Sequence, residues 1–156
     1  MTSCNSISEM AYKNILVAID GSNVANLLIK RAHEMAPNAH LDILNVVDTS
    51  GGYFGTMVMN ADIVYQMEQD AETAIQADYV YAHSIGHDDV DIHVRFGSPK
   101  KVIANDFPKD HHNDLIVVGE TGLSRLQRAM AGTVPSYVTK SAAVDVLVLR
   151  TSELTQ

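Results

Sequence analysis

The chain of 156 residues contains a single cysteine, Cys4, and no tryptophan. One thiol excludes an intrachain disulfide, which fits a reducing compartment. No apolar run approaches the roughly 20 residues that a membrane-spanning helix needs. The N-terminal stretch MTSCNSISEM lacks both the basic start and the apolar segment of a secretory signal. These absences predict a cytoplasmic protein without a membrane partner.

Basic residues are also scarce. The chain has 11 Lys and Arg against 19 Asp and Glu, a formal net charge of −8, which argues against nucleic acid as a partner. The shortage of basic residues lies in the first part of the chain, which has 3 basic and 13 acidic residues up to Val94. From Arg95 onward there are 8 basic and 6 acidic residues. The later part could therefore attract an anionic ligand, although solubility alone also explains such an asymmetry.

What the sequence does contain is an alternation of short apolar runs with amphipathic stretches. The apolar runs predict five buried strands, Lys13–Asp20, His40–Val47, Val90–Phe96, Asp114–Gly119 and Asp145–Arg150. Between them, helices are predicted from Ser22 to Pro37, over residues 60–83, from Ser98-Pro99 to Phe107 and over Val134–Ser141. This alternation predicts an α/β fold, with one open, mainly parallel sheet covered by helices on both faces. We expect a single domain over residues 12–152, with short tails at 1–11 and 153–156.

Three predicted strands end in residues suited to a ligand site. Asp20 follows the first strand, Val46 lies near the end of the second, and Gly119 ends the fourth. In open parallel sheets ligands bind beyond the carboxyl ends of the strands, where the strand order reverses. We therefore expect the site at this edge, although Asp20 could instead cap the turn that follows it.

The connector after the fourth strand carries the spacing Gly119-x2-Gly122-x9-Gly132-Thr133. It matches neither G-x-x-x-x-G-K-[ST] nor G-x-G-x-x-G, so a P-loop and a standard dinucleotide site are not supported. Glycines let a backbone approach a ligand closely, and the helix that Thr133 opens presents free N–H groups suited to phosphate. The alternative is that the glycines only turn the chain and that Thr133 only caps the helix.

Other clusters of polar residues give weaker indications. Asp110, His111, His112 and Asp114 could suggest a metal site, but adjacent residues point to different sides and no metal-ligand spacing recurs, so we interpret them as a polar loop. No metal-binding residues of the chain's own are therefore predicted. No nucleophile elbow is present and no general base is placed, so we predict no catalytic residues either. Any hydrolysis of a nucleotide should therefore be slow.

Several blocks together resemble the universal stress protein family in its ATP-binding form. They are ILVAIDGS, ILNVVD, GSPKKVIANDF, DLIVVGETGLSRLQRAMAGTVPSYV and VDVLVLR, and they cover nearly the whole chain. The resemblance implies a Rossmann-like, five-stranded parallel sheet with order 3-2-1-4-5. It also implies a cytoplasmic stress-response regulator that binds an adenine nucleotide. Two alternatives stay open: an interaction dimer that binds no nucleotide, a form that the family also contains, and a slow ATPase.

The resemblance also assigns roles to individual residues. It implies that Asp20 lies near the ribose or the metal-bound phosphates of ATP, with Mg²⁺ or Mn²⁺ accompanying the nucleotide, and that the main chain of Val46 meets the adenine edge. The residues implied to wrap the ribose and phosphates are Gly119, Gly122, Gly132, Thr133 and Val134. Pro135 stands where the family usually has a small or polar residue, and Asn45 replaces a frequent histidine. The last strand, Val144–Arg150, is an edge in this order and is implied to form a homodimer.

Overall fold

The computed structural model describes residues 11–21, 24–50, 61–120 and 133–150. Its five strands are β1 (Asn14–Ile19), β2 (His40–Asp48), β3 (Val90–Gly97), β4 (Leu115–Glu120) and β5 (Asp145–Arg150). All neighbouring strands run parallel, in the order β3-β2-β1-β4-β5. The predicted fold class is therefore confirmed, and each strand lies within two residues of its predicted bounds.

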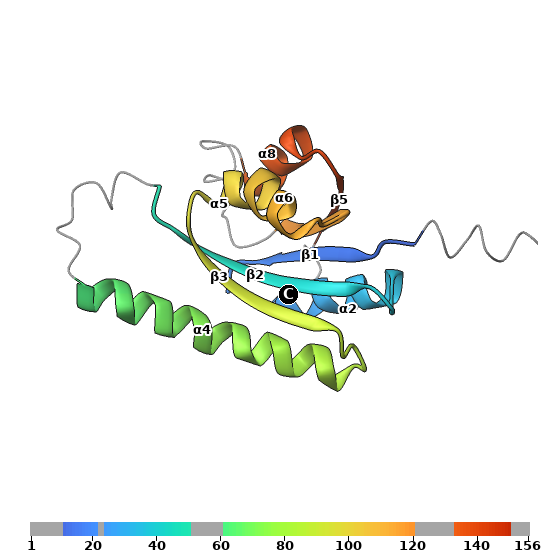
Figure 1. Ribbon diagram of the computed structural model, residues 1–156, viewed down its shortest axis with the longest axis horizontal. Coiled ribbons are helices and arrows are strands. Elements are labelled where there is room, and N and C mark those ends of the chain that lie inside the picture. Colours follow the sequence, from blue (N-terminus) through green and yellow to red (C-terminus); the bar gives the residue numbers. More distant parts are fainter. Residues whose placement is uncertain (1–10, 22–23, 51–60, 121–132, 151–156) are drawn as a thin grey trace, which may run out of the picture.

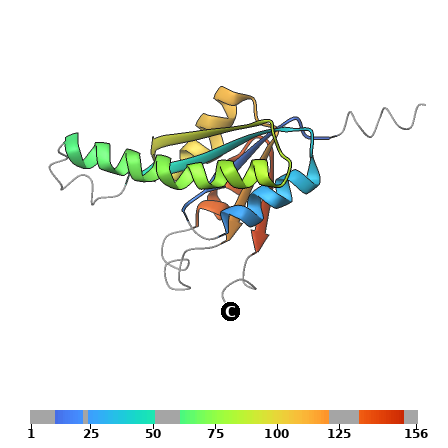
Figure 2. The same ribbon diagram turned by 90° about the horizontal axis from the view of Figure 1, so that it is seen from below.

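Helices cover both faces of the sheet (Figure 1). Helices α2 (Ala25–Met35) and α4 (Ala61–Ser84) lie on one face, and Figure 2 shows both running across it. The opposite face carries α5 (Pro99–Lys101), the π-helical turn η1 (Val102–Asp106), α6 (Phe107–His111) and α8 (Val134–Ser141). Within the described ranges, no helix combines the length and the apolar character that a membrane crossing requires.

The helix that starts at Ser98-Pro99 is longer than predicted. It was expected to end near Phe107, but its path continues through η1 and α6 to His111. Pro108 explains the change of hydrogen-bond pattern, because it has no N–H to donate to the carbonyl four residues earlier. The N–H of Phe107 bonds instead to the carbonyl of Val102, five residues back, which is the π pattern. The extension brings His111 over the sheet.

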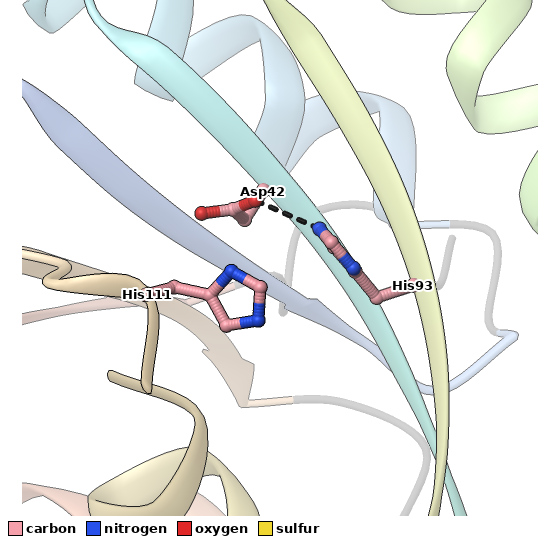
Figure 3. A group of neighbouring side chains, drawn as sticks. All are labelled: Asp42, His93 and His111. Carbon is pink, nitrogen blue, oxygen red and sulfur yellow. Dashed lines mark hydrogen bonds and ion pairs between the residues drawn. The ribbon is translucent and has the colours of Figure 1, made fainter. Parts of the chain in front are cut away.

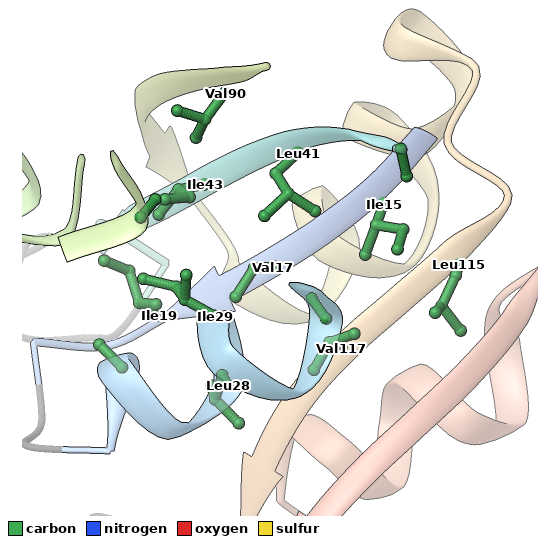
Figure 4. Close-up of a cluster of buried hydrophobic side chains, with 14 of the residues drawn as sticks. Ile15, Val17, Ile19, Leu28, Ile29, Leu41, Ile43, Val90, Leu115 and Val117 are labelled. Carbon is green, nitrogen blue, oxygen red and sulfur yellow. The ribbon is translucent and has the colours of Figure 1, made fainter. Parts of the chain in front are cut away.

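The core on the α2/α4 face consists of aliphatic side chains. Alternate residues of each strand point to this face, as Ile15, Val17 and Ile43 do in Figure 4. Leu28 and Ile29 of α2 pack against them, with exposed fractions of 2% and 0%. This apolar packing fixes the strands, and with them the level at which each strand ends.

The opposite face has a second core around Leu16, Leu44 and Phe107. Asp42 lies among these apolar residues with only 2% of its surface exposed. Burial tends to raise the pKa of its carboxyl group, but hydrogen bonds from His93 and Asn113 outweigh burial and hold the pKa below its ordinary value. A buried carboxylate therefore interrupts the second core, beside β3.

Candidate functional site at the carboxyl edge of the sheet

A cavity of about 260 Å³ opens at the carboxyl ends of β1, β2 and β4. Its walls are mainly aliphatic, because the helices on both faces bring apolar side chains to this edge. The described lining residues are Ala18, Ile19, Asp20, Val24, Ala25, Leu28, Val46, Asp48, Pro99, Ile103, Val118, Gly119, Val134 and Pro135. An apolar slot with a few polar groups at its rim is the usual form of a small-molecule site.

The cavity begins where β1 stops and β2 continues. The last paired residues of these strands are Ile19 and Asn45, whereas β2 runs on to Asp48. The main-chain N–H and C=O groups of β2 point alternately to its two neighbouring strands. The N–H of His40 bonds to Lys13 on the β1 side, and the N–H of Thr49 bonds to Gly97 on β3. Even-numbered residues of β2 therefore direct these groups to β1, and odd-numbered residues direct them to β3. In this register the N–H of Val46 points to the carbonyl of Ile19, and the carbonyl of Val46 points to the space beyond it.

Two carboxylates stand at the rim of this cavity. Asp20 directly follows β1 and is exposed, and Gly21 then takes a φ of +80°, a left-handed turn that suits glycine. Asp48 ends β2, and its Oδ1 accepts hydrogen bonds from the N–H and the hydroxyl of Ser50, at 2.9 and 2.6 Å. Among the lining residues that the structure describes, Asp20 and Asp48 carry the only ionisable side chains.

The N-terminus of α8 forms another part of the rim. Thr133 is its N-cap, and the Thr133 hydroxyl oxygen accepts a hydrogen bond of 3.2 Å from the N–H of Ser136. In the first turn of α8 the cap binds the N–H of Ser136, and Pro135 has no N–H. The N–H of Val134 is the donor of this turn that stays available for a ligand. The Thr133 O–H can still donate, because capping uses only a lone pair of its oxygen.

The residues assigned to the site from the sequence are brought together only in part. Asp20, Val46, Gly119 and Val134 line the cavity, and Thr133 lies next to it as the cap of α8. Gly122 and Gly132 lie outside the described residues. Sequence reasoning missed Asp48, although it ends β2, and it missed Pro99 and Ile103, although the Ser98-Pro99 helix start follows β3 toward the same edge.

The polar residues around His111 divide among different partners. The carboxylate of Asp114 accepts hydrogen bonds from the main-chain N–H groups of Lys13 and Asn14, and Asp110 lies 3.6 Å from Arg95. His112 is exposed, at a φ of 56°. His111 instead lies against Asp42 and His93. Asp110 and His111 belong to α6, so the expectation of a polar loop is wrong for these two residues, whereas His112 and Asp114 do lie between α6 and β4.

Comparison with known proteins identifies the family. The family model described as "Universal stress protein family" matches residues 11–150. The chain belongs to the universal stress protein family. Among curated universal stress proteins, one from Staphylococcus aureus strain USA300 is 36% identical over 147 residues, which is 93% of this chain and 88% of the relative.

Solved structures of universal stress proteins share the fold. UspA from Lactobacillus plantarum has a TM-score of 0.68 at 32% identity, over 89% of this chain and 98% of that protein. A universal stress protein whose crystal structure is in complex with cAMP has a TM-score of 0.71 at 24% identity, over 91% and 99% of the two chains. The family resemblance inferred from the sequence is thus confirmed.

Proposed function

We propose that this universal stress protein binds an adenine nucleotide, with ATP and Mg²⁺ as its ligand, in the cavity at the carboxyl edge of the sheet. The observation that carries the proposal is the position of Val46. Its main chain faces the space that β1 leaves open, between apolar walls from β1, β4 and α2. That a relative of the same fold is described in complex with cAMP supports the same class of ligand.

The cavity suits a purine base. An adenine ring is flat and largely apolar on its faces, which fits a slot between Ala18, Leu28 and Ile103. Its edge carries an exocyclic amine that donates hydrogen bonds and ring nitrogens that accept them. The carbonyl of Val46 would accept from that amine, a contact that depends on the strand register and on no side chain.

The rim suits phosphates that carry a cation. The N–H of Val134 and the hydroxyl of Thr133 can donate to phosphate oxygens at the positive end of α8. Asp20 and Asp48 would repel a bare triphosphate, whereas a divalent cation reverses this effect, since carboxylate and phosphate oxygens are the ligands that Mg²⁺ prefers. We assign Asp20 to this cation, which would neutralise phosphate charge; Gly122 and Gly132 remain assigned to the phosphates from the sequence.

We propose further that the chain forms a homodimer through β5. This strand is an edge of the sheet, and its Val146, Leu147 and Val148 are only partly buried within one chain. The N–H of Asp114 bonds to Asn14 on β1, so the odd-numbered residues of β4 face β5. Since Val117 pairs with Leu147, the main chain of Leu147 faces the open side, ready to pair with a second copy.

Family membership supports the role of a cytoplasmic stress-response regulator that responds to its nucleotide. Two alternatives stay distinct from this proposal. An interaction dimer without a ligand would leave the cavity unused, and a slow ATPase would release phosphate. No histidine or lysine lies among the described lining residues, and among these residues only the two rim carboxylates could act as a general base.

Titration calorimetry and thermal unfolding with MgATP test the proposal on the full chain. At a ligand concentration of about 100 times Kd, binding should stabilise the fold by about 2.7 kcal/mol. Gly119→Ala and Gly119→Val form a graded series, because Gly119 lies in a strand that tolerates β-branched residues and also lines the cavity. Affinity should fall stepwise from Gly to Ala to Val while the ligand-free Tm stays close to that of the parent.

The absence of any heat or stabilisation with millimolar MgATP would contradict nucleotide binding and favour the interaction dimer. Phosphate release near a typical enzyme value of about 10 s⁻¹ would instead favour the ATPase. Mass spectrometry of the protein purified under native conditions adds an independent test, because it identifies any nucleotide carried along.

A further inference from the structure

We propose that Asp42, His93 and His111 form a binding site for a divalent transition-metal ion, of which Zn²⁺ is the best match. The three side chains come from β2, β3 and the end of α6, and they point toward one another on the face of the sheet opposite to α2 and α4 (Figure 3). One potential ligand atom from each lies within 4.8 Å of the other two.

The donor set is the first argument for the metal. Two imidazole nitrogens and one carboxylate oxygen form a common ligand set for zinc in proteins, in which three protein groups leave a fourth position for water. Carboxylate clusters alone would suit Ca²⁺ or Mg²⁺, whereas imidazole favours zinc and its neighbours in the first transition series. The chemistry therefore differs from that of a Mg²⁺ ion carried by a nucleotide.

The distances are close to those that the ion needs. A tetrahedral site with bonds of 2.0–2.1 Å has its ligand atoms about 3.3 Å apart. Nε2 of His93 and Oδ1 of Asp42 now lie 2.8 Å apart in a hydrogen bond, and the longest separation within the group is at most 4.8 Å. Shifts of about 1.5 Å or less, within the reach of side-chain rotation, would complete the geometry.

Surrounding residues hold two of the ligands in place. The side-chain amide of Asn113, itself 4% exposed, donates to Oδ2 of Asp42 at 2.9 Å. The ring of His111 stacks on Phe107, with centroids 3.9 Å apart and planes 10° from parallel. Hydrogen-bonded and packed supports of this kind orient metal ligands and raise affinity.

Nearby charges act in both directions. Nη2 of Arg95 lies 3.4 Å from Nε2 of His111, and a cation there opposes a metal ion. The Arg95 side chain is 40% exposed and also lies 3.6 Å from Asp110, so it can turn toward that carboxylate when the ion binds. On the other side of Asp42, Nε2 of His40 lies 3.2 Å from Oδ1 of Asp42. The exposed carboxylates of Asp89 and Asp91 lie 2.8 and 3.5 Å from the same ring and add negative charge near the site.

The site is separate from the nucleotide cavity. Asp42 and Val46 are four residues apart on β2, which corresponds to about 13 Å along an extended strand. Asp42 lies on the α6 side in the first half of β2, whereas the residues of β2 that line the cavity are Val46 and Asp48. Binding of the transition metal and binding of MgATP can therefore be measured independently.

Cobalt and zinc titrations of the chelator-treated full chain test the proposal, in a Cys4→Ser background that removes the only thiol. We expect a 1:1 complex whose visible Co²⁺ spectrum is that of tetrahedral nitrogen and oxygen ligands. His111→Phe keeps a ring to stack on Phe107, and His93→Gln keeps a polar group beside Asp42. Each should weaken zinc binding by at least about tenfold. The matched control is His112→Ala, an exposed neighbour that should leave affinity unchanged.

Long-range ¹H–¹⁵N spectra of the histidine rings give a second readout without any substitution in the site. Adding Zn²⁺ should shift the ring nitrogens of His93 and His111 and leave those of His112 and His83 in place. Absence of 1:1 binding, affinity retained in both site variants, or spectral shifts confined to other histidines would overturn the proposal. The three residues would then form only a hydrogen-bonded network around a buried carboxylate.

Discussion

Nδ1 of His33 lies 2.8 Å from Nδ1 of His87, and the geometry around them fixes which ring carries the proton. Nε2 of His87 lies 2.7 Å from the carbonyl oxygen of Ala39, so this nitrogen must carry a hydrogen and donate it. Neutral His87 then accepts at Nδ1, and His33 donates to it. Protonating His87 at Nδ1 would remove this acceptor, so the bond would survive only if His33 moved its hydrogen to Nε2. It would also place a positive charge on a ring that is only 1% exposed.

This pair predicts that acid destabilises the fold through His87. Burial is the largest cause that lowers the pKa of His87 below its ordinary value of 6.5. Since the unfolded chain takes up the proton first, the stability that neutral His87 provides is complete above about pH 6.5 and declines as the pH falls toward the lower folded pKa.

Urea unfolding of the parent and of His87→Gln measures this contribution. At pH 7.5 the substitution should cost about 1–3 kcal/mol, because it disturbs buried hydrogen bonds. The difference between parent and variant should shrink at pH 5. A difference that stays constant over this range would mean that His87 does not titrate between the two states.

Asp78 on α4 predicts the opposite dependence on pH. Burial raises the pKa of its carboxyl group from 3.8 to about 6. The folded chain therefore holds this proton more tightly, and stability falls as the pH rises from about 4 to above 6. Asp78→Asn should stabilise the fold at pH 7.5 by about 1 kcal/mol, less than the full shift implies because the group is half-buried, and should have little effect at pH 4.

Thermal unfolding at both pH values checks this prediction. The control is Asp70→Asn, an exposed carboxylate on the same helix. Equal stabilisation by the two substitutions at pH 7.5 would indicate a general effect of net charge on this acidic chain rather than the burial of Asp78.

Thr133 separates capping from ligand binding. Thr133→Val removes the hydroxyl that accepts from the N–H of Ser136 and should lower stability by about 1 kcal/mol. If the hydroxyl also donates to a phosphate, the substitution should in addition weaken MgATP binding by about 1.5–3 kcal/mol, which is roughly tenfold or more in Kd. Thr133→Ser should retain both properties, and Thr139→Val serves as a control on the same helix. Parent-like affinity in Thr133→Val would leave Thr133 as a cap alone.

The dimer through β5 is tested at Leu147. Leu147→Pro removes the outward N–H and should convert the dimer to a monomer in light scattering, since proline is tolerated on an edge strand but cannot donate. Leu147→Ala loses similar packing while keeping the N–H, and it should remain dimeric. If both variants stay dimeric at the parent's concentration dependence, the interface lies elsewhere.

The sequence predicted the strands well because each one is a continuous apolar run. It also predicted that Asp20 and Gly119 would meet, because the carboxyl ends of parallel strands share an edge. Strand order came from the family resemblance and not from the periodicity of the residues. Asp48 was missed because its position depends on how far β2 extends beyond β1, which no local pattern encodes.

His111 was misjudged for a related reason. Its neighbours along the chain face other ways, so the local stretch gave no ligand spacing. Its partners Asp42 and His93 come together only through the pairing of β2 with β3. The contact also depends on the π-helical turn before Pro108, which extends the helix to His111. A helix ending at Phe107 would have left the histidine in a loop.

The offset between the ends of β1 and β2 has a consequence for how this protein could diverge. The carbonyl of Val46 reaches the cavity because β1 stops at Ile19, so substitutions of the Val46 side chain leave that acceptor in place. Point mutations can thus reshape the apolar walls without removing the main-chain contact. If β1 were two residues longer, its main chain would pair with the Val46 carbonyl and make it unavailable to a ligand. Ligand binding should therefore tolerate insertions and deletions after Ile19 far less than replacements of the Val46 side chain.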